Sequence, residues 1–168
     1  MPSGHSNLEP GIRNAVRAVI VRDNSVLMLR KWDDQQAFRY ALPGGAQESG
    51  ETLAAALRRE CLEEIGCEVQ LGPLLLVADY FKRRNSEPPS YRQLIEYLFR
   101  CDVPSDYQPQ NGSRPDKHQL GVAWMPRNEL PSLTMTPTFL ADFLTGDLDG
   151  SPRYTDNYAD HADSEEYR

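Results

Sequence analysis

The sequence contains little cysteine, and its three cysteines follow no disulfide pattern. Cys61, Cys67 and Cys101 are odd in number and are embedded in apolar runs. This pattern argues against a disulfide framework and favours free, buried thiols over a zinc site. Such thiols are typical of a reducing compartment, so we expect a cytoplasmic protein.

The sequence also lacks a long apolar stretch and an excess of positive charge. No run of about 18 apolar residues is present, so no membrane span is expected. The first 14 residues hold no apolar segment typical of a secretory signal. The net charge is −7, which makes a general grip on nucleic acid unlikely. The remaining composition, 39% hydrophobic and 26% charged over 168 residues, suits one domain with a sizeable core.

Apolar runs alternate with polar, turn-rich segments along the chain. The runs predict strands over residues 15–22, 25–31, 39–45, 68–82, 91–103 and 120–126. The first two are separated by Asp23-Asn24 as in a hairpin, and Gly72-Pro73 marks a bulge. Strands that bracket helices in one chain predict the α/β class, with a mixed β-sheet sandwiched between α-helices.

Helices are expected over residues 51–65 and 137–144, with Ser49 as a cap and Gly66 as the stop of the first. Residues 1–12 are expected to form a flexible leader and 13–147 a single domain. The polar, acidic residues 148–168 are expected to be a partly disordered tail.

Three glutamates gather near the C-terminal end of the first expected helix. Glu60, Glu63 and Glu64 would face the negative end of the helix dipole and repel one another. At about 100° per residue they lie within roughly 100° of arc, at the edge of the packed face. A solvated charged face is the ordinary interpretation, but the dipole and the repulsion both oppose it. Because Mg²⁺ prefers carboxylate oxygens and offsets both costs, the cluster predicts a metal site.

The residues before this helix fit the same interpretation. Pro43-Gly44-Gly45 can bring backbone close to a ligand, so that a carbonyl could join the coordination shell. Glu51 falls in the expected first turn, where the helix dipole favours an acid. Arg59 follows just over two turns later, and its side chain is long enough to tie the loop to the helix.

Residues 45–67 resemble the signature of the Nudix hydrolases, G-x5-E-x7-R-E-U-x-E-E-x-G-U, where U is a bulky apolar residue. Seven fixed positions fall in register: Gly45, Glu51, Arg59, Glu60, Glu63, Glu64 and Gly66. The segment "VAWMPRNELPSL", residues 122–133, resembles the W-x-P-x-x-x-L segment of the same family. The resemblance implies the Nudix fold.

The resemblance also implies a function and a role for each residue of the motif. Nudix hydrolases act on a nucleoside diphosphate linked to another moiety and use Mg²⁺ or Mn²⁺. Glu60 and Glu64 would be the principal metal ligands and Glu63 a ligand or base, all three catalytic. Gly45 would offer its carbonyl to the metal. Glu51 and Arg59, together one structural pair, would hold the loop.

The general base is left open by the sequence. Some branches of the family use a glutamate of the motif, and others use a carboxylate on a later loop. Here the later loop reads "SRPDKHQLGVAW" and offers only Asp116 and His118, each of which suits an ordinary surface residue. A base within the motif, Glu63, is therefore expected.

The substrate is poorly defined by the sequence. The motif of the NADH-cleaving branch is absent. So is the proline about fifteen residues beyond the signature that marks ADP-ribose hydrolases. Candidate contacts to a small nucleotide-type substrate are Arg30, Tyr80, Lys82 and Arg83, although strand ends and core aromatics are the ordinary roles of such residues. A homodimer is left open.

A catalytically silent Nudix domain that senses nucleotides is the alternative function. Such modules usually lose glutamates of the motif, and this chain retains all of them. An enzyme, a pyrophosphohydrolase, is therefore the favoured interpretation.

Overall fold

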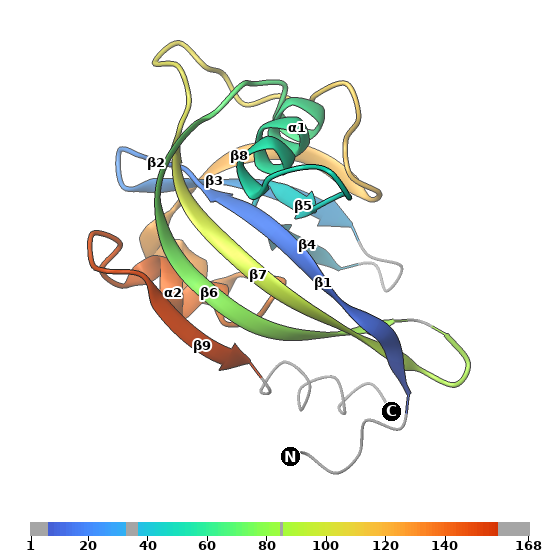
Figure 1. The fold of residues 1–168 in the computed structure, drawn as a ribbon. Helices are drawn as coiled ribbons and strands as arrows, with labels where there is room; N and C mark the ends of the chain where they lie inside the picture. The colour runs from blue at the N-terminus through green and yellow to red at the C-terminus, as the bar shows by residue number, and fades with distance from the viewer. Residues whose placement is uncertain (1–6, 33–36, 85, 158–168) are drawn as a thin grey trace.

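Two β-sheets lie between two α-helices in the computed structural model, which describes residues 7–32, 37–84 and 86–157 (Figure 1). The elements follow the chain in the order β1 (Leu8–Val19), β2 (Val21–Arg22), β3 (Ser25–Trp32), β4 (Phe38–Ala41), β5 (Gly44–Ala46), α1 (Leu53–Ile65), β6 (Gln70–Arg84), β7 (Ser90–Asp102), β8 (Gln119–Pro126), η1 (Arg127–Ser132), α2 (Leu140–Thr145) and β9 (Arg153–Asn157). The expected α/β class is confirmed.

One sheet has five strands in the order β5-β1-β7-β6-β9, and the other consists of β2, β3, β4 and β8. Strand β1 pairs with β7 in parallel and with β5 antiparallel. The larger sheet is thus mixed, as expected. In the smaller sheet β3 pairs antiparallel with β4 and β8.

Alternate side chains of the central strands pack in two separate apolar cores. Leu27 and Leu29 of β3 pack in one cluster with Leu57 and Ile65 of α1. Met28 of β3 packs in a second cluster with residues of α2 and η1. Because successive side chains of a strand point to opposite faces, the sheets separate α1 from α2.

Several local expectations are confirmed. Asp23 and Asn24 have φ of 49° and 59°, which suits the tight hairpin turn between β2 and β3. Register shifts between Leu71 and Leu76 mark the bulge around Gly72-Pro73. All three cysteines are free and buried. Among the described residues, no helix has both the length and the apolar character needed to cross a bilayer.

Helix α1 begins later than expected and has a different cap. Its N-cap is Thr52, whose hydroxyl accepts a hydrogen bond from the Ala55 N–H at 3.1 Å, so Ser49 is not the cap. Glu51 therefore precedes the helix instead of lying in its first turn. The helix ends as expected at Gly66, which has φ of 68°.

The ends of the domain also differ from the sequence expectation. Strand β1 begins at Leu8, within the expected leader, and β9 lies within the expected tail. Both segments pair with long central strands, β7 and β6, whose pairing was not visible in the sequence. The remaining parts of the leader and tail, residues 1–6 and 158–168, lie outside the described residues.

Candidate metal and catalytic site

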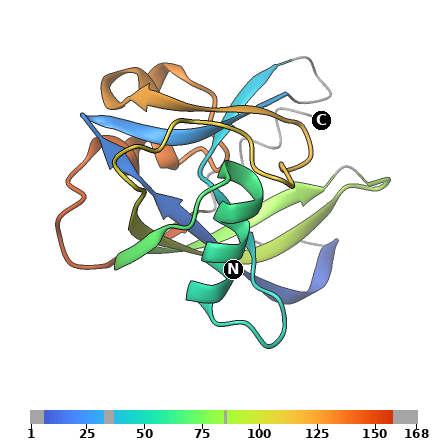
Figure 2. The ribbon, with the colours of Figure 1, turned by 90° about the horizontal axis from the view of Figure 1, so that it is seen from above.

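The C-terminal end of α1 is capped by backbone and side-chain donors, not by basic residues of its own. The N–H of Gly112 donates to the Glu64 carbonyl at 3.0 Å, and the N–H of Arg114 donates to the Glu63 carbonyl at 2.9 Å. The Tyr107 hydroxyl donates to the Ile65 carbonyl at 2.8 Å. The loop that supplies these donors crosses the helix end in Figure 2. The backbone carbonyls at the helix end thus have hydrogen-bond donors from this loop, and the glutamate side chains take no part in the cap.

Glu64 is a buried carboxylate with one hydrogen bond. Its side chain is almost fully enclosed, and Oε2 accepts from the Gly44 N–H at 2.8 Å. Oε1 has no hydrogen-bond partner among the described residues. Burial raises the pKa of Glu64 to about 8, although the Gly44 hydrogen bond and the charge of Arg17 oppose the shift. A buried, undercompensated carboxylate of this kind is stabilised by a nearby cation.

Glu60 lies directly against the glycine loop. A Cβ atom at Gly45 would stand 2.5 Å from the carboxylate carbon of Glu60, so a larger residue there would push the Glu60 side chain away from the loop. Glu60 Oε1 accepts from Arg59 Nη1 at 3.0 Å. Burial raises the pKa of Glu60, and the ion pair with Arg59 opposes this. The backbone of Gly45 and a carboxylate of α1 therefore share one small space.

Arg59 ties the loop to the helix. Its Nε and Nη2 atoms donate to the two oxygens of Glu51 at 2.8 and 2.9 Å, and Nη2 also donates to the Ala46 carbonyl at 3.1 Å. The hydrogen bonds from Arg59 and from the Glu48 N–H lower the pKa of Glu51 to about 2. The structure thus brings together the two residues expected as a pair.

Glu63 is the most open of the three α1 glutamates. Its side chain is 26% exposed and stands 3.7 Å from Arg59 Nη1, a longer contact than Glu60 makes. The side chain is therefore accessible to a substrate or a water molecule beside the helix.

The donor set fits a divalent cation, although the side chains are not gathered into a ligand cluster. Among the described residues, no group of three or more His, Cys, Asp or Glu side chains is arranged to hold a metal. Glu60 instead turns to Arg59, and Glu64 turns to the Gly44 N–H. The carboxylates nonetheless lie one turn apart beside a glycine backbone, and hard oxygen donors are what Mg²⁺ or Mn²⁺ selects.

An ion pair beside the loop was not predicted from the sequence. Arg17 of β1 donates from Nη1 to the Gly44 carbonyl at 2.9 Å and from Nε to Glu96 Oε2 at 3.0 Å. Glu96 of β7 is buried. The only sequence signal was a charge within each apolar run, and the pairing of β1 with β7 was needed to join them.

The two loop candidates for the general base differ in position. Burial raises the pKa of Asp116, but its contact with Lys31 outweighs burial and holds the pKa below its ordinary value. The charge of Asp116 also acts on Glu64, which places it near the glutamates. His118 is exposed and has φ of 69°. The charge of Asp116 therefore acts on the site, while the side chain of His118 is exposed to solvent.

The expected substrate contacts do not all fall together. Tyr80 and Lys82 of β6 share one face of the larger sheet. Arg83 follows Lys82 directly, so its side chain points to the opposite face. The guanidinium of Arg30 stacks over Phe38 at 3.9 Å from the ring centre. Tyr80 is buried against Ala15 and Leu94, so Lys82 is the better candidate for a substrate contact, and Arg83 lies on the other face of the sheet.

A helix of clustered glutamates bound to a glycine loop, on two sheets between helices, describes a Nudix domain. Residues 11–145 match the family model for the NUDIX domain, so the chain belongs to the Nudix family. The predicted family and the Nudix fold are confirmed.

Two curated relatives and a solved structure illustrate the similarity. The chain is 30% identical over 135 residues to the putative ADP-ribose pyrophosphatase YjhB of Bacillus subtilis, covering 77% of this chain and 60% of that protein. It is 37% identical over 96 residues to an ADP-ribose pyrophosphatase of Methanocaldococcus jannaschii, covering 57% and 53%. The fold of a NUDIX hydrolase from Nitrosomonas europaea matches with a TM-score of 0.61 at 20% identity, covering 86% and 77%. The matches thus span only somewhat more than half of the two curated relatives.

Proposed function

We propose that the chain hydrolyses a diphosphate linkage in a nucleoside diphosphate-X substrate, with Mg²⁺ or Mn²⁺ as cofactor. The observation that carries the proposal is the buried Glu64 beside Glu60, both against the backbone of Gly44 and Gly45. Glu60 and Glu64 would be the principal metal ligands, together with the carbonyl of Gly45. Membership of the Nudix family supports this assignment.

The residues of the site have separate roles in an in-line attack by water on phosphorus. The Glu51–Arg59 pair and Arg17 hold the glycine loop in place, so that its backbone lines the reaction site. When bound, the metal neutralises charge on the diphosphate and lowers the pKa of water. No covalent nucleophile is needed.

Glu63 is the proposed general base. A base must lie within about 3 Å of the water or act through one bridging water. Glu63 is open to that approach, whereas Asp116 is held ionised by Lys31 and has a lowered pKa, which makes it a poorer proton acceptor.

ADP-ribose is the first substrate to test, because the names of both curated relatives contain it. The missing proline beyond the signature argues for testing other nucleotides as well. A phosphate-release screen over ADP-ribose, nucleotide sugars, dinucleoside polyphosphates and dNTPs, with Mg²⁺ or Mn²⁺, would identify the substrate. Products from none of them would contradict the proposal and favour the silent, nucleotide-sensing alternative.

Two further expectations belong to the proposal. The free, buried thiols of Cys61, Cys67 and Cys101 support a reducing compartment such as the cytoplasm. A homodimer stays a prediction, which light scattering coupled to size-exclusion chromatography would test.

A further inference from the structure

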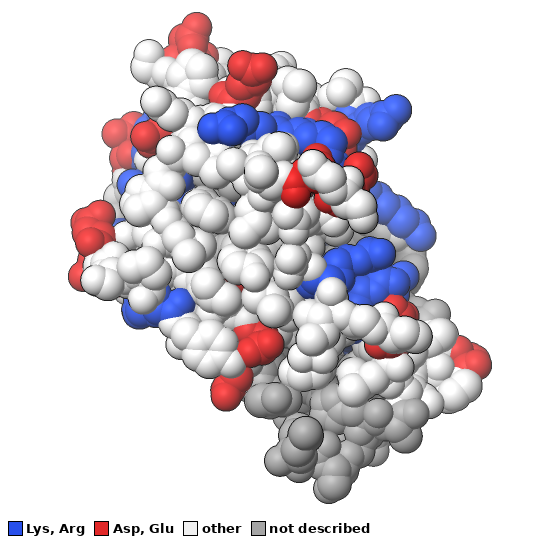
Figure 3. Space-filling model, in the orientation of Figure 1, with Lys and Arg blue, Asp and Glu red and all other residues white. Residues whose placement is uncertain are grey.

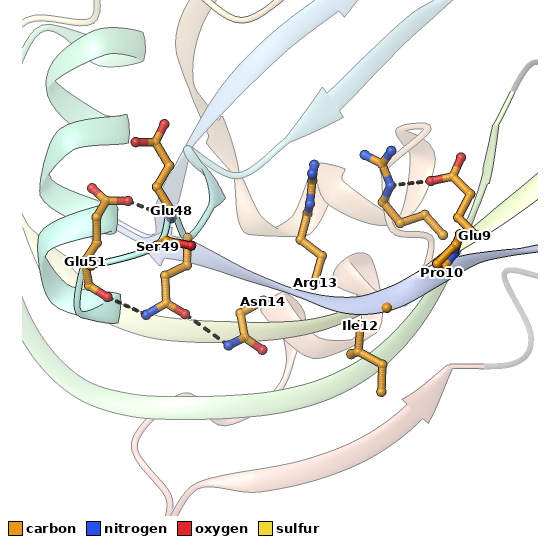
Figure 4. Close-up of a pocket in the computed structure, with 12 residues that line it drawn as sticks. Glu9, Pro10, Ile12, Arg13, Asn14, Glu48, Ser49 and Glu51 are labelled. Atoms are coloured by element: carbon orange, nitrogen blue, oxygen red, sulfur yellow. Dashed lines mark hydrogen bonds and ion pairs between the residues drawn. The ribbon is translucent and has the colours of Figure 1, made fainter.

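A groove of about 730 Å³ lies between the N-terminal half of β1 and the loop that precedes α1 (Figure 4). Its walls include residues 9–14 on one side, residues 47–51 on the other, and Arg92 of β7. Asn14 donates to Gln47 at 3.0 Å, and Gln47 donates to the Glu51 carbonyl at 2.7 Å. The groove is thus joined to the loop that Glu51 and Arg59 hold beside the proposed metal site.

Basic side chains line this end of the larger sheet on one face. Lys82 of β6 pairs directly with Arg92 of β7, and Arg13 of β1 pairs with Leu94 two residues further along β7. Paired residues share a face, so Arg13, Lys82, Arg84 and Arg92 form one basic strip. Figure 3 shows basic side chains gathered beside this part of β1.

The charges of the basic strip are only partly compensated. Glu9 accepts from Arg92 at 2.7 Å and lies 3.7 Å from Arg84. Arg13 has no hydrogen bond or ion pair with the described residues, and it stands upright in the groove between the loop and the Glu9 pair (Figure 4). Like charges directly opposite each other on neighbouring strands are destabilising, as for Lys82 and Arg92.

The basic strip extends away from the proposed reaction site. Arg17 touches the Gly44 carbonyl, and Arg13 lies four residues earlier on the same strand. At about 3.3 Å per residue the two Cα atoms are separated by roughly 13 Å. One sugar ring and a long arginine side chain together can span this distance. Glu48 and Ser49 also line the groove and can accept hydrogen bonds from hydroxyl groups.

We propose that the groove binds a sugar phosphate at the X end of the substrate, with the phosphate on Arg13 and its neighbour Arg92. The inference rests on the proposed function, because only a hydrolase of this kind has a substrate with an X end. Binding of a sugar phosphate in the groove does not itself require hydrolysis. It distinguishes a substrate with a second, remote phosphate from a plain nucleoside diphosphate sugar.

Calorimetric titration of the metal-free protein with ribose 5-phosphate, ribose and inorganic phosphate at low salt tests the site. Ribose 5-phosphate should bind at least tenfold more tightly than either of the others, and Arg13→Ala should weaken it at least fivefold. Arg83→Ala removes the same charge from the opposite face of the sheet and should change the affinity less than twofold.

Three outcomes contradict the inference. Equal binding of inorganic phosphate would show attraction for a free anion, and equal binding of ribose would exclude recognition of phosphate. An equal loss in Arg13→Ala and Arg83→Ala would show diffuse charge attraction. Binding of ribose 5-phosphate without hydrolysis of any nucleotide would leave the groove intact and overturn only the proposed function.

Discussion

Glu64 is the residue whose surroundings most require a cation. It is buried, its carboxylate lies one turn from that of Glu60, and among the described residues one backbone N–H donates to it. The helix position is visible in the sequence, as are the three glutamates. Their burial is not visible, because it depends on the glycine loop folding back over α1. Arg17 and Glu96 were missed because only the pairing of β1 with β7 brings them together.

Glu64→Gln should stabilise the metal-free protein at pH 8. The raised pKa of about 8 means that between pH 4.5 and 8 the unfolded state loses a proton that the folded state keeps, so wild-type stability falls as pH rises. The variant should lack this fall and gain on the order of 1–3 kcal/mol at pH 8. Denaturant unfolding at pH 5 and pH 8 measures both. Parallel pH profiles for the two proteins would show that burial does not raise the pKa of Glu64.

Glu63→Gln and Asp116→Asn separate the two candidate bases. Loss of a general base costs about 10²–10⁴-fold in turnover, which we expect for Glu63→Gln with metal affinity little changed. Asp116→Asn should cost less than about tenfold, because its pairing with Lys31 makes it a weak base. Steady-state kinetics on the identified substrate decides between them. The opposite ranking would move the base to the loop.

Helix α1 and the loop before it form one structural unit. The loop is attached to the helix by the Glu51–Arg59 pair and to β1 by Arg17. The sequence predicted this helix and its stop at Gly66, because both depend on local signals. It misplaced the cap by three residues, since Ser49 and Thr52 are both good caps and only the structure shows which hydroxyl accepts the Ala55 N–H.

Arg59→Ala should lower both stability and activity, in contrast to the glutamate variants. The lowered pKa of Glu51 means that its ion pair contributes stability above its ordinary pKa of 4.5 and loses it as the pH falls toward 2. The melting temperature of Arg59→Ala should therefore lie below the wild type at pH 7, and the gap should narrow near pH 2.5.

Activity of Arg59→Ala should fall by more than about tenfold, because the glycine loop loses its position. Arg58→Ala, an exposed neighbour on the same helix, serves as the control and should match the wild type. An Arg59→Ala protein with unchanged melting and kinetics would show that the pair does not hold the loop.

At the scale of the whole molecule, most strands were predicted from their apolar runs, but their neighbours were not. Register between distant strands depends on the complete sheet, so the chain from 15 to 22 was read as one strand and is divided between two sheets. The same limit hid β9, whose polar sequence pairs with β6 at the sheet edge.

Truncation after Gly150 tests whether β9 belongs to the domain. The cut removes the β6–β9 pairing and the contact of Arg153 with the Phe143 ring, 5.0 Å from its centre. We expect a loss of about 1–2 kcal/mol in the free energy of unfolding, with activity retained. An unchanged free energy of unfolding would show that the pairing of β9 with β6 does not stabilise the domain.

Turnover of wild type and Glu64→Gln across the nucleotide screen, with and without Mg²⁺, tests whether Glu64 holds a catalytic metal. We expect metal-dependent release of a nucleoside monophosphate by the wild type from at least one nucleoside diphosphate-X compound. We expect a loss of about 100-fold or more in Glu64→Gln, in a protein that stays folded. Near-wild-type, Mg²⁺-dependent turnover by Glu64→Gln would contradict this role of Glu64.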